Sequence, residues 1–380
     1  MGNFVVSQLL HLSQRFEITV LVPYFVPVKE LFLPRSFPSF QDLEVHYVKN
    51  IAYDLYGKRT LNWMTVPEMH LAIKRRAAMS LLARAQALHT QRPFALVYGH
   101  EAFIGDEAAS IGEKLGIPSF FTLHSFFDYR LSQIGELAMR AIMHNLSQCT
   151  QLISVSQRAL DSYAVHGLTT ANAKIIPNGV DLPKQEHTLR KMIGINQDDL
   201  CLLSVGSFTP EKRFNQSIET LYYLHQHGFP SAHLLLIGKG QEETHLKELS
   251  HRLGVFHFVH FCGEVQPHEM SPYYATADML IHPSIIESFS MVCLEAMAHG
   301  LPIICTKNIG LIEFIDTRIE ALVIPPDDSD ALHAAVAMLA ADPKKRAIIG
   351  KAARQRAALM TWDKQSAIVI NLFNRYGENA

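Results

Sequence analysis

Short apolar runs rich in β-branched residues recur along the chain, and most of them precede a segment with the spacing of an amphipathic helix. This alternation is typical of parallel strands that crossover helices bury on both faces. Six strands are predicted in the first half, at 18–23, 43–48, 95–99, 119–123, 151–155 and 173–177. Six more are predicted in the second half, at 200–206, 232–238, 256–263, 277–283, 301–306 and 321–326. The pattern therefore predicts an α/β fold with two doubly wound parallel sheets.

The length of 380 residues exceeds what one hydrophobic core usually supports, so we expect two domains. The segment PNGVDLPKQEHT (177–188) replaces the periodic pattern with Pro, Gly and polar residues, and we interpret it as a hinge. We predict a first domain over 1–182 and a second over 183–360. The closing segment, 361–380, is predicted to contain one amphipathic helix.

Composition excludes several classes of protein. A formal net charge of -2 gives no general attraction to nucleic acid or to anionic lipid, so an anion must be bound locally. The five cysteines are dispersed and form no C-x-x-C pair, which favours a reducing cytosol and small packing roles. No apolar stretch approaches the roughly 20 residues that a membrane span needs, and we expect a cytoplasmic protein.

The N-terminus departs from the usual order of a doubly wound domain. There the first strand comes before a glycine turn and the first helix. In this sequence Gly2 opens the chain and the helical pattern follows at once. We expect that the strand before Gly2 is missing from this sequence, which would leave its neighbours with unpaired backbone groups.

The loop after strand 200–206 carries two adjacent cations. Thr209 can cap a helix and Pro210 suits its first position, which predicts Lys212 and Arg213 in the first turn. Cations are disfavoured at that end of the helix dipole, and a bound anion would reverse the sign. The alternative is a solvated basic pair that Glu211 partly balances.

The stretch ESFSMVCLEAMAHGLPII (287–304) follows strand 277–283 and begins a helix that ends at Gly300. The amides of 288–291 are expected to point out of the helix N-terminus, where an anion can bind. Glu287 in the loop and Glu295 on the helix would then flank a ligand that offers phosphates and hydroxyls. The alternative is an exposed loop carboxylate and a second one that favours its helix terminus through the dipole. A pair of glycosidase carboxylates is a further possibility, but those must face each other across an open cleft. Two glutamates on one loop and the helix after it fit ligand binding better.

Taken in order, several motifs resemble glycosyltransferase family 4, the retaining transferases that use nucleotide-sugar donors. These motifs are ISVSQRALDSY, KIIPNGVDL, SVGSFTPEKRF, LLIGKGQE, VHFCGEV, YYATADMLIHPSIIESFSMVCLEAMAHGLPII and LVIPPDDSDAL followed by TWD. The resemblance implies the GT-B fold, in which two Rossmann-like domains face a cleft and the C-terminal helix returns to the first domain. It implies transfer of a sugar from a nucleotide diphosphate, with retention, to a hydroxyl group.

The resemblance also assigns residues. Glu287 should meet the donor sugar and Glu295 should hold the ribose hydroxyls, while Lys212 matches the basic lysine of the family and His124 a histidine near the transferred sugar. The catalytic set is therefore Glu287, His124 and Lys212. The donor-binding set is Glu295, Arg213, Ser288, Phe289, Ser290, Met291, Gly206, Gly238, Gly263, Val265 and Gly2, the last being all that remains of the N-terminal glycine loop.

Two positions depart from the family pattern. Ser207 stands where an arginine of the family usually binds the diphosphate, so this contact is absent unless Arg213 supplies it. Ser290 stands where a glycine is common. A non-catalytic or N-terminally truncated nucleotide-sugar-binding relative is therefore one alternative, and a nucleotide-sugar epimerase of GT-B fold is another. A nicotinamide oxidoreductase is disfavoured, because GKG at 238–240 lacks the third glycine of the dinucleotide fingerprint.

The expected partners are a nucleotide-sugar donor, with a uridine diphosphate sugar the commonest choice in the family, and a glycan or lipid-linked acceptor. No cofactor and no metal is expected, since the histidines lack cysteine or carboxylate partners at ligand spacing. The segment 70–89 has a basic helical face that suits a peripheral contact with the inner face of the membrane. The alternative is that this helix simply packs on the first sheet.

Overall fold

The computed structural model describes residues 3–24, 44–49, 67–100, 106–127, 136–183 and 187–377. Contacts divide the chain into two compact units. The first contains Met1–Pro177 with Gln365–Ala380, and the second is the continuous segment Asn178–Lys364. These boundaries lie within a few residues of the predicted ones at 182 and 360.

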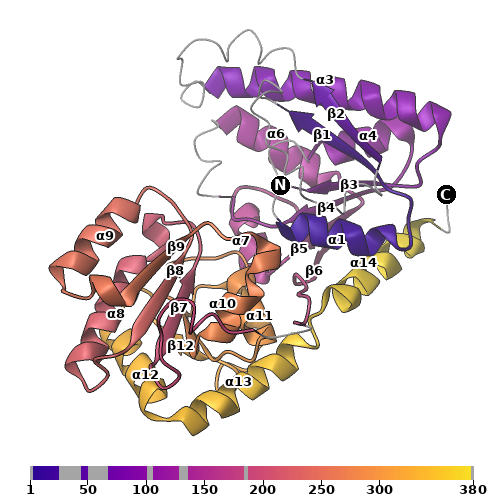
Figure 1. Cartoon of the computed structure of the whole chain (residues 1–380). Coiled ribbons are helices and arrows are strands. Elements are labelled where there is room, and N and C mark those ends of the chain that lie inside the picture. Colours follow the sequence, from indigo (N-terminus) through magenta and orange to yellow (C-terminus); the bar gives the residue numbers. More distant parts are fainter. Residues whose placement is uncertain are drawn as a thin grey trace. The chain divides into compact units, whose positions relative to one another are not determined.

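The first unit contains two separate parallel sheets (Figure 1). Its strands are β1 (Thr19–Tyr24) paired with β2 (Glu44–Lys49), and β3 (Val97–His100), β4 (Ser119–Leu123), β5 (Gln151–Ser154) and β6 (Ala173–Ile175) in that order. Its helices are α1 (Asn3–Ser13), α3 (Pro67–Gln91), α4 (Glu107–Leu115), α6 (Glu136–Ser147), α7 (Gln157–Ala164) and most of α14 (Trp362–Gly377). All six strands predicted in this half are present.

Both faces of the larger sheet of this unit are buried. Successive side chains of a strand point to opposite faces, so neighbouring residues pack against different helices. Phe120 of β4 packs with Leu12 of α1 and Phe373 of α14. The helices α1 and α14 lie side by side (Figure 1). The next residue, Phe121, packs on the other face with Ile142 of α6. A strand that is buried on both faces appears in the sequence as an unbroken apolar run, and that run made β4 predictable.

Among the described strands, β1 pairs only with β2, and β3 only with β4. Leu21 of β1 and Val97 of β3 nevertheless pack against one apolar cluster, formed by Leu81, Ala85 and Ile111. In the described part of the chain, β1 and β3 therefore pack against the same apolar cluster but form no hydrogen-bond ladder with each other. Gly2 lies outside the described residues, and the strand expected before it stays a prediction.

The second unit has one six-stranded parallel sheet with the order β12-β11-β10-β7-β8-β9, so its six predicted strands are also present. Its strands are β7 (Cys201–Val205), β8 (His233–Ile237), β9 (Val259–Gly263), β10 (Met279–His282), β11 (Ile303–Thr306) and β12 (Leu322–Ile324). Its helices are α8 (Phe214–Gln226), α9 (Glu243–Arg252), α10 (Ser271–Thr276), α11 (Met291–Ala298), α12 (Ser329–Ala341) and α13 (Pro343–Ala357).

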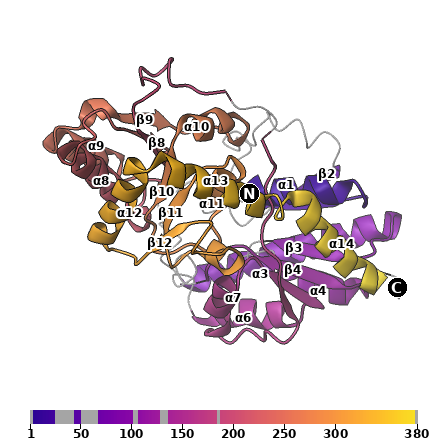
Figure 2. The same ribbon diagram turned by 90° about the horizontal axis from the view of Figure 1, so that it is seen from below.

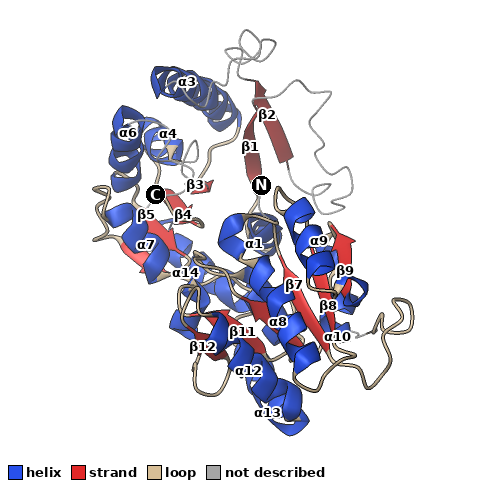
Figure 3. Cartoon of the chain, turned by 90° about the vertical axis from the view of Figure 1, so that its left-hand side faces the viewer, coloured by secondary structure: helices blue, strands red, loops and turns tan. Residues whose placement is uncertain are grey.

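Helices cover both faces of this sheet. Leu202 and Met279 pack with Ile218 of α8 and Val336 of α12 in one core, and α8 and α12 lie side by side (Figure 3). On the other face α11 contacts β10 and β11, and α13 packs against α11 (Figure 2). The two units are thus doubly wound α/β domains, as predicted. The five cysteines are free thiols, four of them buried.

Candidate functional site

The order of the second sheet reverses at β7 and β10, its two central strands. In open α/β sheets, ligands bind beyond the carboxyl ends of the strands at such a reversal. Lys212 belongs to the 3-10 turn Pro210–Lys212 that follows β7, and Glu287 lies in the loop that follows β10. The topology therefore brings to one sheet edge two residues that are 75 positions apart in sequence.

Glu287 is fixed through both its backbone and its side chain. Its N–H donates to the carbonyl of Asn308 at 3.1 Å, and its carbonyl accepts from the N–H of Gly310 at 3.0 Å. Its Oε1 accepts hydrogen bonds from Nζ of Lys212 and, at 3.0 Å, from Nε2 of His282. Within the described residues Oε2 accepts no hydrogen bond, so one carboxylate oxygen remains available to a ligand.

The charges of this cluster are set by competition between burial and neighbours. Burial by itself would raise the pKa of Glu287, but the hydrogen bond from His282 and the charge of Lys212 outweigh it and lower that pKa to about 2. Burial would lower the pKa of His282, whereas Cys293 and the Glu287 carboxylate raise it above its ordinary value. Glu287 is therefore a carboxylate, not a carboxylic acid, at neutral pH.

The loop between Glu287 and α11 has a left-handed residue immediately before the helix. Ser290 has φ +87° and ψ 83°, a region that favours glycine, and its hydroxyl lies 3.3 Å from Nε2 of His282. Phe289 is 2% exposed and anchors the loop. The backbone N–H groups of Phe289, Ser290 and Met291 have no hydrogen-bond acceptor among the described residues. These amides are three of the four predicted for the donor.

Glu295 lies on α11 and is held by a neighbouring helix. The hydroxyl of Tyr274, on α10, donates to its Oε2 at 2.6 Å. Burial raises the pKa of Glu295, and the hydrogen bond from Tyr274 opposes that rise. The carboxylate is thus not an exposed residue that merely favours its helix terminus.

The predicted helix start after β7 was wrong. Residues 210–212 form a separate 3-10 turn, and α8 begins at Phe214, because Arg213 between them has φ +54° and interrupts the helix. Arg213 forms a two-point ion pair with Asp327, with Nε 2.6 Å from Oδ1 and Nη2 3.2 Å from Oδ2. The cation expected at the diphosphate is therefore already bound to a carboxylate of this chain.

The glycines at the ends of β7, β8 and β9 have a structural explanation that involves no ligand. A Cβ on Gly238 would lie 1.9 Å from the carbonyl oxygen of Gly206, and Gly238 itself has φ +136°. The N–H of Gly238 donates to the carbonyl of Gly263 at 2.8 Å, which ties the end of β8 to the end of β9. Val265 follows two residues later and is half-buried. These contacts shape the sheet edge that carries four of the predicted donor-binding residues, Gly206, Gly238, Gly263 and Val265.

His124 belongs to the first unit, where it ends β4 beside a second histidine. Nδ1 of His100 lies 2.9 Å from Nε2 of His124, and the two rings stack with centroids 5.2 Å apart. Burial lowers the pKa of His100 to about 3, and burial together with His100 holds the pKa of His124 well below its usual range. Both rings are therefore neutral at physiological pH. Gly2, the remaining predicted residue, lies outside the described residues.

Four partners of the predicted residues were missed, namely His282, Tyr274, Asp327 and His100. His282 and His100 are the last residues of β10 and β3 and lie within one residue of the ends predicted for these strands, at 283 and 99, so their position was a usable signal. Tyr274 and Asp327 contact Glu295 and Arg213 from other elements, and no local pattern links them.

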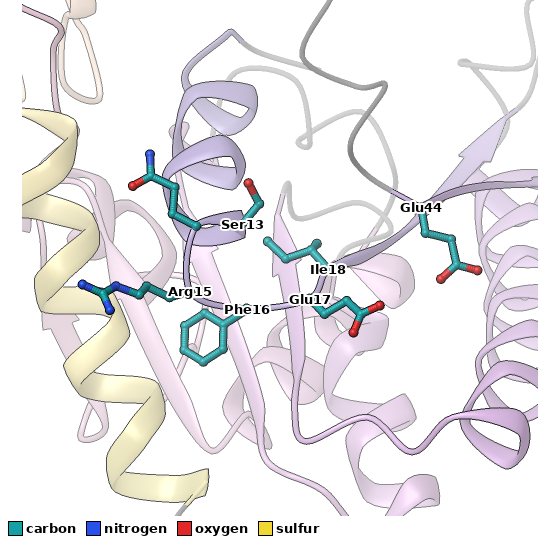
Figure 4. Close-up of a pocket in the computed structure, with 7 residues that line it drawn as sticks. Ser13, Arg15, Phe16, Glu17, Ile18 and Glu44 are labelled. Carbon is teal, nitrogen blue, oxygen red and sulfur yellow. The ribbon is translucent and has the colours of Figure 1, made fainter.

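A surface pocket in the first unit lies where α1 meets β1 (Figure 4). It is lined by residues 13–18 and by Glu44, and Glu17 is ion-paired with Arg92. This is the amino end of β1 and β2, the sheet edge opposite to the one where ligands of doubly wound domains bind. We assign no role to it.

Two further surveys concern membranes and metals. No described helix is long and apolar enough to cross a membrane. Among the described residues, no three His, Cys, Asp or Glu side chains are grouped as metal ligands. The basic helix α3 packs Leu81 and Ala85 against Ile111, as expected for a helix that covers the first sheet, and it leaves Met79 and Arg84 exposed.

Family comparisons cover most of the chain. Residues 1–184 match the family model described as Glycosyltransferase Family 4, and residues 185–356 match the one described as Glycosyl transferases group 1. The junction of the two matches lies near the division between the two units of the structure.

Individual relatives are more distant. An uncharacterized glycosyltransferase of Methanocaldococcus jannaschii is 28% identical over 234 residues, and the match spans 59% of this chain and 59% of that relative. D-inositol 3-phosphate glycosyltransferase 2 of Catenulispora acidiphila is 26% identical over 320 residues, 79% of this chain and 75% of that protein. The crystal structure of Anabaena HepE with UDP has a TM-score of 0.78 at 18% identity, covering 98% of this chain and 96% of HepE, and HepE has also been solved with UDP-glucose.

Proposed function

Because the chain belongs to the family 4 type of GT-B glycosyltransferases, we propose that it transfers a sugar from a nucleotide diphosphate donor to a hydroxyl of a glycan or lipid-linked acceptor, with retention at the anomeric carbon. The observation that carries the proposal is the Lys212–Glu287–His282 cluster at the carboxyl edge of β7 and β10. It combines a cation for a diphosphate with a carboxylate for sugar hydroxyls, beside amides that have no partner among the described residues.

In the proposed reaction the acceptor oxygen bonds to the anomeric carbon while the bond from that carbon to the diphosphate oxygen breaks. The acceptor proton passes to the leaving diphosphate. Lys212 and the amides of Phe289, Ser290 and Met291 stabilise the charge that develops on the diphosphate. Oε2 of Glu287 accepts a hydrogen bond from the donor sugar, and His124 is proposed as a catalytic residue on the family resemblance alone.

We propose a UDP-sugar as the donor. HepE, which shares the fold, is the protein solved with UDP and UDP-glucose. For the acceptor, the exposed basic face of α3, with Arg75 and Arg84, suits a peripheral contact with a membrane that carries a lipid-linked sugar. The chain would then act at the cytoplasmic face.

The test is transfer from UDP-glucose and other UDP-sugars to a panel of glycan and lipid acceptors, with Glu287→Gln as the variant and Glu248→Gln, an exposed residue of α9, as the matched control. We expect Glu287→Gln to lower transfer by about 100-fold or more while UDP affinity changes little, since it removes one charged contact to the sugar.

Each other result has a defined meaning. Nucleotide binding without transfer or donor hydrolysis by the unaltered chain would show a non-catalytic relative. Conversion of the donor sugar in the absence of any acceptor would show an epimerase. Equal transfer by Glu287→Gln and Glu248→Gln would remove Glu287 from the reaction.

A further inference from the structure

Tyr274 is buried beside a residue predicted to bind the nucleotide. Its side chain is 1% exposed, on the short helix α10, and its hydroxyl donates to Oε2 of Glu295 at 2.6 Å. A buried phenol requires a hydrogen-bond partner, and a charged acceptor makes the strongest one. Tyr274 and Glu295 are 21 positions apart, so this bond joins two separate elements at the site.

His299 fixes the ring of Tyr274 from the end of α11. The two rings stack with centroids 4.8 Å apart at 28°. Nδ1 of His299 lies 2.8 Å from the carbonyl oxygen of Glu295, so this nitrogen is the donor. In the neutral ring Nε2 is then the acceptor, and the hydroxyl of Ser271 at 2.9 Å donates to it. Ser271, Tyr274 and His299 thus tie α10 to α11 around the Glu295 side chain.

The consequence is a carboxylate with one oxygen occupied and one available. Over 187–377, Oε1 of Glu295 accepts no hydrogen bond from the chain, and the side chain is only partly buried. A side chain whose rotamer is locked by such supporting contacts presents its acceptor at a defined position without further ordering.

From this geometry we propose that Tyr274 is a positioning residue for nucleotide recognition: its hydroxyl holds Oε2 of Glu295 so that Oε1 accepts the ribose hydroxyls of the donor. The inference rests on the proposed function and adds a specificity element to the same site. Tyr274 does not touch the ligand, and its effect appears only in how strongly the ribose hydroxyls are preferred.

The experiment measures the affinity of the full chain for UDP and for 2′,3′-dideoxy-UDP by calorimetry. Tyr274→Phe removes only the hydroxyl. Tyr223→Phe is the matched control, since Tyr223 also stacks on a histidine, His227, but lies on α8. We expect Tyr274→Phe to reduce the preference for UDP over the dideoxy nucleotide by about five- to tenfold. Tyr223→Phe should leave the preference unchanged.

The ratio of affinities separates positioning from a structural role. If Tyr274 only supports the fold, Tyr274→Phe weakens both nucleotides equally, the ratio is unchanged, and the inference is overturned. In Glu295→Gln the ratio should fall as well, and adding Tyr274→Phe should then lower it little further. If the unaltered chain binds neither nucleotide, the proposed UDP donor is overturned, and the inference that rests on it falls too.

Discussion

The guanidinium of Arg213 faces the carboxylate of Asp327 at two points, Nε to Oδ1 at 2.6 Å and Nη2 to Oδ2 at 3.2 Å, and both residues have left-handed backbones with φ +54° and +56°. Each residue accepts a disfavoured conformation, and the pair joins the loop after β7 to the loop after β12. A diphosphate that binds beside Lys212 must compete with Asp327 for this cation.

Removal of that competition should strengthen donor binding. We expect Asp327→Ala to raise UDP affinity by about two- to fivefold, because an exposed ion pair of this kind contributes roughly 0.2–1 kcal/mol and its removal frees the charge of Arg213 for the phosphates. Calorimetric titration with UDP measures this. Asp330→Ala, which removes the same charge from an exposed position three residues away, should change affinity less than twofold. Equal effects of the two variants would mean that Arg213 stays away from the diphosphate.

His282 should control the acid limit of activity. The ionised form of Glu287 is the stronger acceptor for a sugar hydroxyl, and in the unaltered chain its pKa of about 2 keeps it ionised throughout the mildly acidic range. His282→Leu removes a hydrogen bond to the charged form, so the Glu287 pKa should rise toward its ordinary value of 4.5. The loss of kcat/KM relative to the unaltered chain should therefore be larger at pH 4.5 than at pH 7. The same relative loss at both values would contradict this role.

Ser290 tests the backbone strain at the start of α11. A side chain at φ +87° is disfavoured by about 1–2 kcal/mol relative to glycine. Ser290→Gly should therefore be more stable than Ser290→Ala by about 1 kcal/mol, even though glycine loses more backbone entropy on folding. Urea unfolding of the two variants measures the difference. A more stable alanine variant would show that the left-handed geometry is not maintained in solution.

The buried histidine pair should make the first unit sensitive to acid. The pKa of His100 is lowered to about 3 from an ordinary 6.5, so the folded state binds fewer protons than the unfolded state below pH 6.5. The free energy of unfolding should then fall with decreasing pH by up to about 1.4 kcal/mol per pH unit from this residue. His100→Gln should reduce the slope between pH 6.5 and 4, whereas His144→Gln, at an exposed position on α6, should leave it unchanged. Urea unfolding followed by circular dichroism provides the slopes.

The strands of both units were predictable because their signal is local and repeated. Runs such as CLLSV in β7 and HLLLI in β8 are buried on both faces, and such burial favours apolar residues at most positions. The start of α8 was not predictable in the same way. Thr209 and Pro210 form a genuine helix-start pattern, but the left-handed Arg213 ends it after one 3-10 turn, and arginine carries no local signal for that conformation.

For the candidate site, local sequence left two interpretations open. Loop position and the helix N-terminus indicated Lys212, Glu287 and Glu295 as ligand-binding or as ordinary surface residues, and the family resemblance favoured the first. The structure adds contacts that sequence spacing does not contain. Glu287 is paired with Lys212 across 75 positions, and Arg213 with Asp327 across 114. Such contacts depend on which loops the sheet order brings together, and no periodicity in a single segment encodes them.

The path of the chain also bears on how the protein is made. Val369, Leu372 and Phe373 of α14 complete a core that otherwise consists of residues from the first half of the sequence. A ribosome therefore delivers the continuous segment Asn178–Lys364 in full before it releases the residues that finish the earlier unit. In the half of the molecule that is translated first, Phe120 and Ile153 therefore lack part of their apolar cover until α14 leaves the exit tunnel.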